Sequence, residues 1–279
     1  MTDHPLYSGT LAPAERAEFV PFMHELAAIS GAVIKQHYLQ GTPVERKSDE
    51  SPVTAADKRA EEVMRLLIAQ RYPDHGVLGE EYGMDRADAR YRWVLDPIDG
   101  TKAFVSNCLI FGSLLSLLRD GRPILGAISH PLTGHVLMGL GGGPTLLGDR
   151  LVRVRSAPKL EEATVLSTGH WEMLKRPDGA AFEAISRRAL LYRTWGDCHG
   201  YFQVATGGAD AMFDPVLKPW DICALVPVIE GAGGRATAID GSDPVNGTDM
   251  LASSGALHEE LLGLMALHTN VGKSQAEAS

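Results

Sequence analysis

The spacing of apolar residues predicts that the chain opens with two helices. Near the start, apolar residues recur every three or four positions, at Phe19, Phe22, Met23, Leu26, Ile29, Val33 and Ile34. This spacing predicts a long amphipathic helix that ends near 41–43. A polar loop over 45–51 follows. A second helix is predicted over 54–71, with Thr54 as its N-cap.

Short apolar runs in the middle of the chain predict an antiparallel sheet. They fall at 76–78, 92–95, 110–118, 124–129, 136–140, 151–154 and 164–167. The turn residues Asp120, Gly121 and Pro123 lie between two of these runs, so we expect a hairpin there. The glycine-rich segment 139–143, followed by Pro144, reads as another turn between strands rather than as a nucleotide loop, because proline would interrupt the helix such a loop requires.

The second half of the chain mixes helices and strands. Helices are predicted at 180–189, 201–206, 220–230 and after 255, and strands at 191–194, 211–213 and 251–253. Elements in blocks, without strict βαβ repetition, favour a layered α+β sandwich. We expect a single unit over 1–279 with an N-terminal half (1–155), a C-terminal half (156–270) that meets it near 156–161, and a frayed tail (271–279).

Composition restricts the classes of partner. With 279 residues, 44% of them hydrophobic, the chain can bury a substantial core. The net charge is -9 and no Lys/Arg block is present, which argues against a nucleic-acid partner. Three cysteines without a CxxC pair fit reduced thiols. No stretch approaches the ~20 apolar residues of a membrane span and no signal pattern opens the chain, so we expect a cytoplasmic protein with no membrane partner.

The most informative segment is Trp-Val-Leu-Asp-Pro-Ile-Asp-Gly-Thr at 93–101. Pro97 removes a ladder donor, so the strand is expected to turn there, with Asp96 and Asp99 at the turn. Two adjacent carboxylates repel each other unless a cation lies between them, and Mg²⁺ is the usual cation. Gly100 and Thr101 are expected to open a helix whose free N–H groups favour an anion. A cation site beside an anion site indicates metal-assisted chemistry on a phosphate ester.

Three further acidic segments have the same placement. Glu80 follows a short apolar run, and Asp57 and Asp221 open predicted helices. Each has an ordinary interpretation, because helix starts and loops collect acids for structural reasons. Taken together, acids at the ends of strands and the starts of helices are what a site for several Mg²⁺ ions requires.

These segments resemble the inositol monophosphatase-like family of Mg²⁺-dependent, lithium-sensitive phosphatases. The resemblance is carried by Gly79-Glu80-Glu81, by Trp93 to Thr101 and by Trp220-Asp221, in order and spacing, and it runs from the first helix to the last. It implies an alternating α-β-α-β-α sandwich of the inositol monophosphatase and fructose-1,6-bisphosphatase type. It also implies a homodimer in most members.

The resemblance also implies roles for individual residues. The metal ligands would be Glu80, Asp96, the Ile98 carbonyl, Asp99 and Asp221. Asp57 would help hold a third, weaker metal and orient Thr101, so that each site holds two or three Mg²⁺ ions. Asp99, Gly100 and Thr101 would bind phosphate through backbone N–H groups. Water would then attack in line without a phosphoenzyme, with Glu80 or the Asp57/Thr101 pair accepting its proton.

Substrate choice must depend on residues outside this set. The segment from Arg193 to Tyr201 resembles the histidinol-phosphate phosphatase branch, and Asp214 occupies the place of a substrate-contacting glutamate in inositol-type enzymes. Asp197 and Asp214 could pair with the ammonium and imidazole of L-histidinol phosphate, and His199 lies in the same segment. Asn107-Cys108-Leu109 departs from the Gly-x-Pro usual in the family.

Other readings remain open. Inositol 1-phosphate is the rival substrate, since inositol hydroxyls also accept carboxylate partners. Asp197 and Asp214 could instead be ordinary turn and strand-end residues. From another class, the chain could be a non-catalytic metal-binding regulatory protein. Cys198 is not favoured as a nucleophile because no base is evident near it. The leading hypothesis is a phosphatase for L-histidinol phosphate in histidine biosynthesis.

Overall fold

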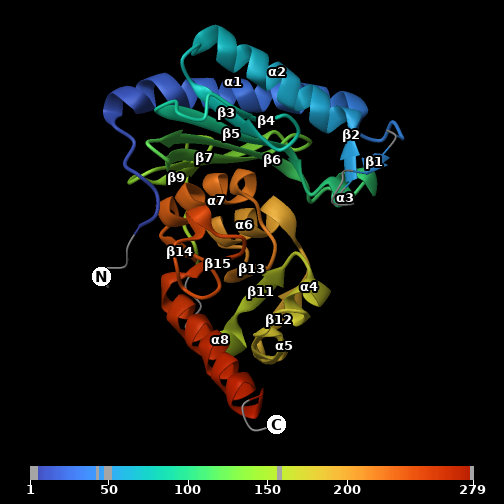
Figure 1. Ribbon diagram of the computed structural model, residues 1–279, viewed down its shortest axis with the longest axis vertical. Coiled ribbons are helices and arrows are strands. Elements are labelled where there is room, and N and C mark those ends of the chain that lie inside the picture. Colours follow the sequence, from blue (N-terminus) through green and yellow to red (C-terminus); the bar gives the residue numbers. More distant parts are fainter. Residues whose placement is uncertain (1–5, 42–43, 47–51, 156–158, 277–279) are drawn as a thin grey trace.

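Two sheets and the helices around them form five alternating layers (Figure 1). This is a computed structural model of residues 6–41, 44–46, 52–155 and 159–276. Its helices are α1 (Pro13–His37), α2 (Ala55–Arg71), α3 (Thr101–Val105), α4 (His170–Leu174), α5 (Gly179–Arg188), α6 (Asp197–Ala205), α7 (Pro219–Gly231) and α8 (Gly255–Ala276). Two short 3-10 helices are η1 (Leu160–Glu162) and η2 (Pro244–Asn246).

The first sheet has eight strands in the order β10-β9-β8-β7-β6-β5-β3-β4. Their bounds are β3 (Gly76–Gly79), β4 (Gly83–Asp85), β5 (Tyr91–Asp99), β6 (Gly112–Arg119), β7 (Arg122–His130), β8 (His135–Leu140), β9 (Thr145–Leu147) and β10 (Arg150–Leu151). All neighbours are antiparallel except β3 and β5. The antiparallel sheet expected from the middle of the chain is therefore confirmed over residues 76–151, with one parallel pair. The run at 164–167, expected in the same sheet, lies instead in a second sheet, where its neighbours are parallel to it.

The second sheet has five strands in the order β12-β11-β13-β15-β14. Their bounds are β11 (Thr164–Ser167), β12 (Leu191–Arg193), β13 (Ala211–Asp214), β14 (Gly234–Thr237) and β15 (Met250–Ser254). Because β11, β12 and β13 are mutually parallel, their carboxyl ends meet at one edge. A small separate ladder pairs β1 (Val44–Arg46) with β2 (Pro52–Thr54).

The layers follow from where the apolar faces are. Helices α1 and α2 cover the outer face of the first sheet, α6 and α7 lie between the two sheets, and α4, α5 and α8 cover the far face of the second (Figure 1). Helix α7 is apolar nearly all round because both sheets bury it. The expected α-β-α-β-α sandwich is confirmed.

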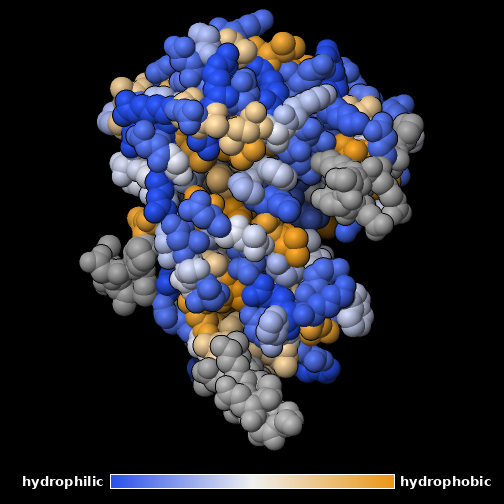
Figure 2. All heavy atoms as spheres, in the orientation of Figure 1, coloured by the Kyte–Doolittle hydropathy of each residue, from blue (hydrophilic) through white to orange (hydrophobic). Residues whose placement is uncertain are grey.

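Helix α1 is, among the residues described, the one helix long and apolar enough to cross a membrane by length and composition. This differs from the expectation that no segment approaches a span. Its apolar face is occupied, because Phe19, Phe22 and Leu26 are buried against Trp93 and the rest of the first sheet. The outward surface of α1 and α2 is largely hydrophilic in Figure 2.

Several local expectations can be compared with the structure directly. The hairpin is confirmed: Asp120 and Gly121 join β6 to β7 with φ of 51° and 81°, the left-handed geometry that two-residue hairpin loops need. The glycine-rich segment is the turn between β8 and β9, as expected. The strand expected at 151–154 is wrong beyond Leu151, because Val154 donates its N–H to Ala232 on the C-terminal end of α7 rather than to a strand.

The remaining expectations concern loops and ends. Residues 47–51 of the expected loop over 45–51 lie outside the described residues, as do 156–158 of the expected boundary and 277–279. The first sheet uses residues 76–151 and the second uses 164–254, on either side of that boundary. Helix α8 continues through Ala276, so most of the segment expected to fray has helical backbone.

Candidate active site

The central acids lie on a strand, not at a turn. β5 continues through Asp99, and its pairing with β6 shifts between Asp96 and Asp99: Asp96 lies opposite Leu114 and Asp99 opposite Gly112. Three steps on β5 therefore match two on β6, which is a β-bulge with one extra residue. The expected turn is wrong because a bulge accommodates Pro97 without ending the strand. In a regular strand residues three apart point to opposite faces, so the extra residue allows both carboxylates to share one face.

The bulge carries the two acids to the start of α7. Carboxylate oxygens of Asp96, Asp99 and Asp221 lie within 4.8 Å of one another. Asp96 and Asp221 are only 2% and 8% exposed. Oδ1 of Asp96 is buried without a hydrogen-bond partner in the described structure, although such groups are normally paired. The sequence prediction that these acids converge is thus met by their positions.

The pKa values of the clustered acids are raised, because these acids are buried and their negative charges lie close together. Burial raises the pKa of Asp96 well above its ordinary value, and the carboxylates of Glu80, Asp99 and Asp221 raise it further. Burial likewise raises the pKa of Asp221 to about 7, against a hydrogen bond from the Lys218 N–H that lowers it. Several buried acids that repel one another are a site that a cation stabilises.

Asp57 serves both the helix and the site. Its Oδ2 accepts hydrogen bonds from the N–H (2.9 Å) and hydroxyl (2.5 Å) of Thr54, which caps α2, so the ordinary helix-start interpretation is correct. Its Oδ1 lies 3.5 Å from the hydroxyl oxygen of Thr101, which also donates to the Ile98 carbonyl at 3.0 Å. Burial raises the pKa of Asp57 to about 6.

Glu80 is held at the edge of the same cluster. Its N–H donates to the Leu95 carbonyl at 3.1 Å, directly before Asp96 in β5, and its charge raises the pKa values of Asp96 and Asp57. The parallel pairing of β3 with β5 explains this placement, because the carboxyl ends of the two strands meet.

Gly100 has a specific reason to be glycine. Its φ is 83°, and a Cβ at this position would lie 2.9 Å from Oδ2 of Asp197. It precedes α3, whose first turn starts at Thr101 as predicted. Asp197 therefore reaches the proposed phosphate-binding segment directly.

Asp197 and Asp214 converge through a residue that sequence reasoning missed. The Asp197 N–H donates to the Thr168 hydroxyl at 2.9 Å, and this hydroxyl donates to Oδ2 of Asp214 at 2.6 Å. Thr168 and Asp214 are at the ends of parallel strands β11 and β13, which explains their meeting. Burial raises the pKa of Asp214 well above its ordinary value, and that of Asp197 to about 6. The sequence predicted the two strands at whose ends Thr168 and Asp214 lie, but it did not predict that these strands pair in parallel.

His199 occupies a different environment. Its ring lies 5.3 Å from that of His130 and stacks with Phe202, and its Nε2 contacts the Gln203 amide at 3.1 Å. Burial and His130 lower its pKa to about 4, so the ring is neutral near pH 7. Its described partners do not include the acid cluster, so contact with substrate stays a prediction.

In the sequence, two residues that flank the site stand out: Cys198 as a disfavoured nucleophile and Asn107 as the start of a departure from the family pattern. The backbone N–H of Cys198 donates to Oδ2 of Asp99, a contact that the sequence did not reveal. The thiol itself is buried, and burial raises its pKa well above the ordinary value, which disfavours a thiolate nucleophile. Asn107 has φ of 58°, so at the departure from Gly-x-Pro the chain uses a residue that tolerates the left-handed region.

The donor set fits a hard divalent cation. Carboxylate oxygens from β5, α7 and the end of β3 converge, with the Ile98 carbonyl in the bulge between Asp96 and Asp99. Mg²⁺ prefers such oxygen ligands, and the unpartnered Asp96 oxygen indicates where one would bind. His and Cys ligands, which softer metals favour, are absent from the described metal cluster.

Comparisons with known proteins point to one family. The inositol monophosphatase family model matches residues 15–270. The chain is 38% identical to the bifunctional phosphatase IMPL2 of Arabidopsis thaliana, covering 81% of this chain and 66% of that protein. It is 34% identical to a histidinol-phosphatase of Streptomyces coelicolor, covering 87% and 94%.

A solved structure of an inositol monophosphatase from Zymomonas mobilis superposes with a TM-score of 0.81, at 33% identity, covering 90% of this chain and 98% of that one. The fold is therefore shared with a known phosphatase. This chain belongs to the inositol monophosphatase family and is a phosphoric monoester hydrolase.

Proposed function

We propose that the protein hydrolyses L-histidinol phosphate to L-histidinol and phosphate, as a Mg²⁺-dependent phosphomonoesterase. The observation that carries the choice of ester is a pair of carboxylates beside the acid cluster, the buried Asp214 and the half-buried Asp197. Three more acids, Asp96, Asp99 and Asp221, already serve a cation, so these two supply negative charge beyond what the metals need.

The family is metal-dependent, and the acid cluster fits that property. We assign Glu80, Asp96, the Ile98 carbonyl, Asp99 and Asp221 as ligands of two Mg²⁺ ions, with Asp57 helping to hold a third. Mg²⁺ at these ligands would stabilise negative charge on the phosphate and leaving oxygens and make a coordinated water more acidic. The backbone N–H groups of Asp99, Gly100 and Thr101 would bind phosphate oxygens.

The chain's own residues then orient the water and take its proton. Thr101 lies between the Ile98 carbonyl and Asp57, so its hydroxyl has a fixed direction. Asp57, with a pKa of about 6, can accept a proton near neutral pH, either directly or through Thr101; Glu80 is the other candidate base. Attack by water without a phosphoenzyme agrees with the protonated state of the buried Cys198 thiol.

Charge favours a cationic alcohol over a neutral one. L-Histidinol carries an ammonium and an imidazole, whereas inositol carries only hydroxyls. A cationic group beside Asp197 would lower the pKa of this carboxyl from about 6 and keep it ionised, which strengthens the pairing. The histidinol-phosphatase name of the Streptomyces relative supports the same substrate.

Inositol 1-phosphate remains the second candidate. It is favoured by the identity and close superposition with the Zymomonas enzyme. Hydroxyl groups of inositol could donate to Asp214, which would preserve the same general geometry.

A substrate panel tests the proposal. Purified protein with Mg²⁺ would be given histidinol phosphate, inositol 1-phosphate, fructose 1,6-bisphosphate and β-glycerophosphate, and kcat/KM measured for each. We expect the highest value with histidinol phosphate. In Asp197→Asn this value should fall at least tenfold, while that for β-glycerophosphate changes little. Equal or better turnover of inositol phosphate by the wild-type protein would overturn the choice of ester.

The proposed substrate implies a pathway and a cellular compartment for the reaction. We place it in the cytoplasm, in histidine biosynthesis, and expect a homodimer as in most of the family. The reduced state of the three cysteines in the structure is compatible with a cytoplasmic location. Light scattering of the purified protein would determine the oligomeric state.

A further inference from the structure

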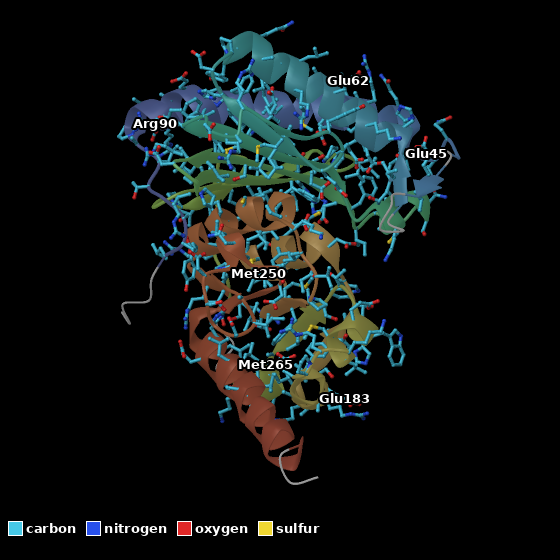
Figure 3. The ribbon with its side chains drawn as sticks, in the orientation of Figure 1. Glu45, Glu62, Arg90, Glu183, Met250 and Met265 are labelled. Carbon is cyan, nitrogen blue, oxygen red and sulfur yellow. The ribbon has the colours of Figure 1, made fainter. Side chains whose placement is uncertain are left out.

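Glu61 is a fully buried acid that the mechanism does not use. It lies on α2 one turn after Asp57, with an exposed side-chain fraction of 0%, and one turn before Arg65. Residues four apart share a helix face, so Asp57, Glu61 and Arg65 form one polar stripe along α2. The neighbouring acid, Glu62, lies exposed on α2 (Figure 3). It pairs with Arg59.

The Glu61 carboxylate accepts hydrogen bonds from the loop that follows β3. Its Oε2 accepts the N–H of Glu81 at 2.8 Å, and its Oε1 accepts the N–H of Tyr82 at 3.1 Å. Oε1 also accepts Nε of Arg65 at 2.7 Å, which balances the buried charge. Arg65 in turn donates to the Gly83 carbonyl at the far end of the same loop.

Gly79 leaves room for this carboxylate. A Cβ at Gly79 would lie 1.9 Å from Oε1 of Glu61 and 2.2 Å from its carboxyl carbon, a distance that no real side chain could occupy. The glycine before Glu80 is therefore required by Glu61, and not by the backbone conformation, because its φ is not in the left-handed region.

Glu80 is consequently fixed on both sides. Its own N–H is bound to the Leu95 carbonyl of β5, and the next N–H in the chain is bound to Glu61. We infer that Glu61, with Arg65 as its counter-ion, is a positioning residue that sets the Glu80 carboxylate against Asp96 and thereby sets the affinity for the cation. This rests on the proposed metal role of Glu80 but not on the identity of the ester.

An isosteric substitution isolates the effect. In Glu61→Gln, one oxygen becomes an amide NH₂ that cannot accept. Whichever way the amide turns, it faces either the Glu81 N–H or the pair formed by the Tyr82 N–H and Arg65. At least one donor loses its acceptor, so the loop must shift and carry Glu80 away from Asp96. Loss of such a supporting partner typically weakens metal binding by about 10- to 100-fold.

The test measures metal binding without substrate. Mg²⁺ is titrated calorimetrically into the full-length, chelator-treated protein, with Mn²⁺ titrated in parallel and followed by electron paramagnetic resonance. We expect Glu61→Gln to weaken binding about tenfold or more, and Glu62→Gln to leave it unchanged. A Glu61→Gln protein that binds Mg²⁺ as tightly as the wild type would overturn the inference.

A matched control separates positioning from loss of stability. Asp210 is also a fully buried acid; it pairs with Arg155 and accepts the Thr164 N–H at 2.6 Å, at the end of β13 remote from Asp214. Asp210→Asn should lower the thermal unfolding temperature as Glu61→Gln does, but leave Mg²⁺ affinity unchanged. Equal weakening in both variants would show a merely structural effect and contradict the inference.

Two further outcomes are distinguishable. If Glu61→Gln does not fold, Glu61→Asp keeps the charge but shortens the reach, and weaker Mg²⁺ binding is again expected; wild-type affinity in that variant would count against the inference. If the wild-type protein itself binds no Mg²⁺, the proposed function fails as well, which the titration of the wild type shows at once.

Discussion

At the scale of single residues, the site acids divide their two oxygens between backbone and site. Oδ2 of Asp57 accepts the N–H of Thr54, the N-cap of α2, Oδ2 of Asp221 accepts the Lys218 N–H at 2.7 Å, and Oδ2 of Asp99 accepts the Cys198 N–H. The helix-start interpretation of Asp57 and Asp221 is therefore correct, and it leaves one oxygen of each acid for the proposed metal site. A hydrogen bond to one oxygen fixes the direction of the other, which preorganises the cluster.

Thr168 provides a residue-scale prediction. Its hydroxyl donates to Asp214 and accepts from Asp197, and a hydrogen bond to a charged group is worth about 1.5–3 kcal/mol. Thr168→Val should therefore raise KM for histidinol phosphate about tenfold or more, with a smaller change for β-glycerophosphate, in steady-state assays. Thr168→Ser should restore selectivity, since it keeps the hydroxyl. A valine variant with unchanged selectivity would show that Asp197 and Asp214 do not recognise the substrate.

At the scale of secondary structure, α1 offers a test of the core. Phe22 is 1% exposed and its ring lies 5.1 Å from Trp93 and 4.9 Å from Tyr72. Phe22→Ala should lower the free energy of unfolding by about 3–5 kcal/mol, because it leaves a cavity between α1 and the first sheet. Urea denaturation measures this. Unchanged stability would mean that α1 does not pack on the sheet.

Some helices and strands could be predicted from the sequence and others could not. Apolar residues at helical spacing located α1 and α2, apolar runs located α7 and most strands, and the motif around Asp96 located the acid cluster. The β5 bulge could not be predicted, because a proline after an apolar run indicates a turn equally well. Short elements such as α4, β4 and β14 carry too few residues for a clear period. Thr168 and Glu61 escaped because their importance depends on contacts between distant segments.

At the scale of the whole molecule, the acid cluster links stability to pH and metal. The buried Asp57, the half-buried Asp197 and the buried Asp221 have folded-state pKa values of about 6, 6 and 7, all raised from 3.8. The folded protein therefore holds protons that the unfolded chain releases. This contribution is fully present below about pH 4 and is lost as pH rises through 6 to 7. A bound cation would replace the protons.

Thermal unfolding with chelator or with Mg²⁺ checks this between pH 6.5 and 8. In that range His199, with a folded-state pKa of about 4, is neutral in the folded protein but about half protonated in the unfolded chain at pH 6.5. Its titration therefore raises stability by about 0.4 kcal/mol between pH 6.5 and 8 and offsets part of the loss from the acids. The metal-free protein should lose about 1–2 kcal/mol of stability as pH rises, and Mg²⁺ should raise the Tm more at pH 8 than at pH 6.5. A metal-free Tm that rises over this range would contradict the assignment.

The central claim is that the acids brought together by the β5 bulge are the metal centre of a phosphatase. The most direct test is phosphate release from L-histidinol phosphate by the wild-type protein and Asp99→Asn, each with Mg²⁺ and with chelator. We predict that the substitution and chelation each reduce the rate by about three orders of magnitude, with the fold retained by circular dichroism, because both remove charge stabilisation from the reacting phosphate. Activity that survives both changes would contradict the account.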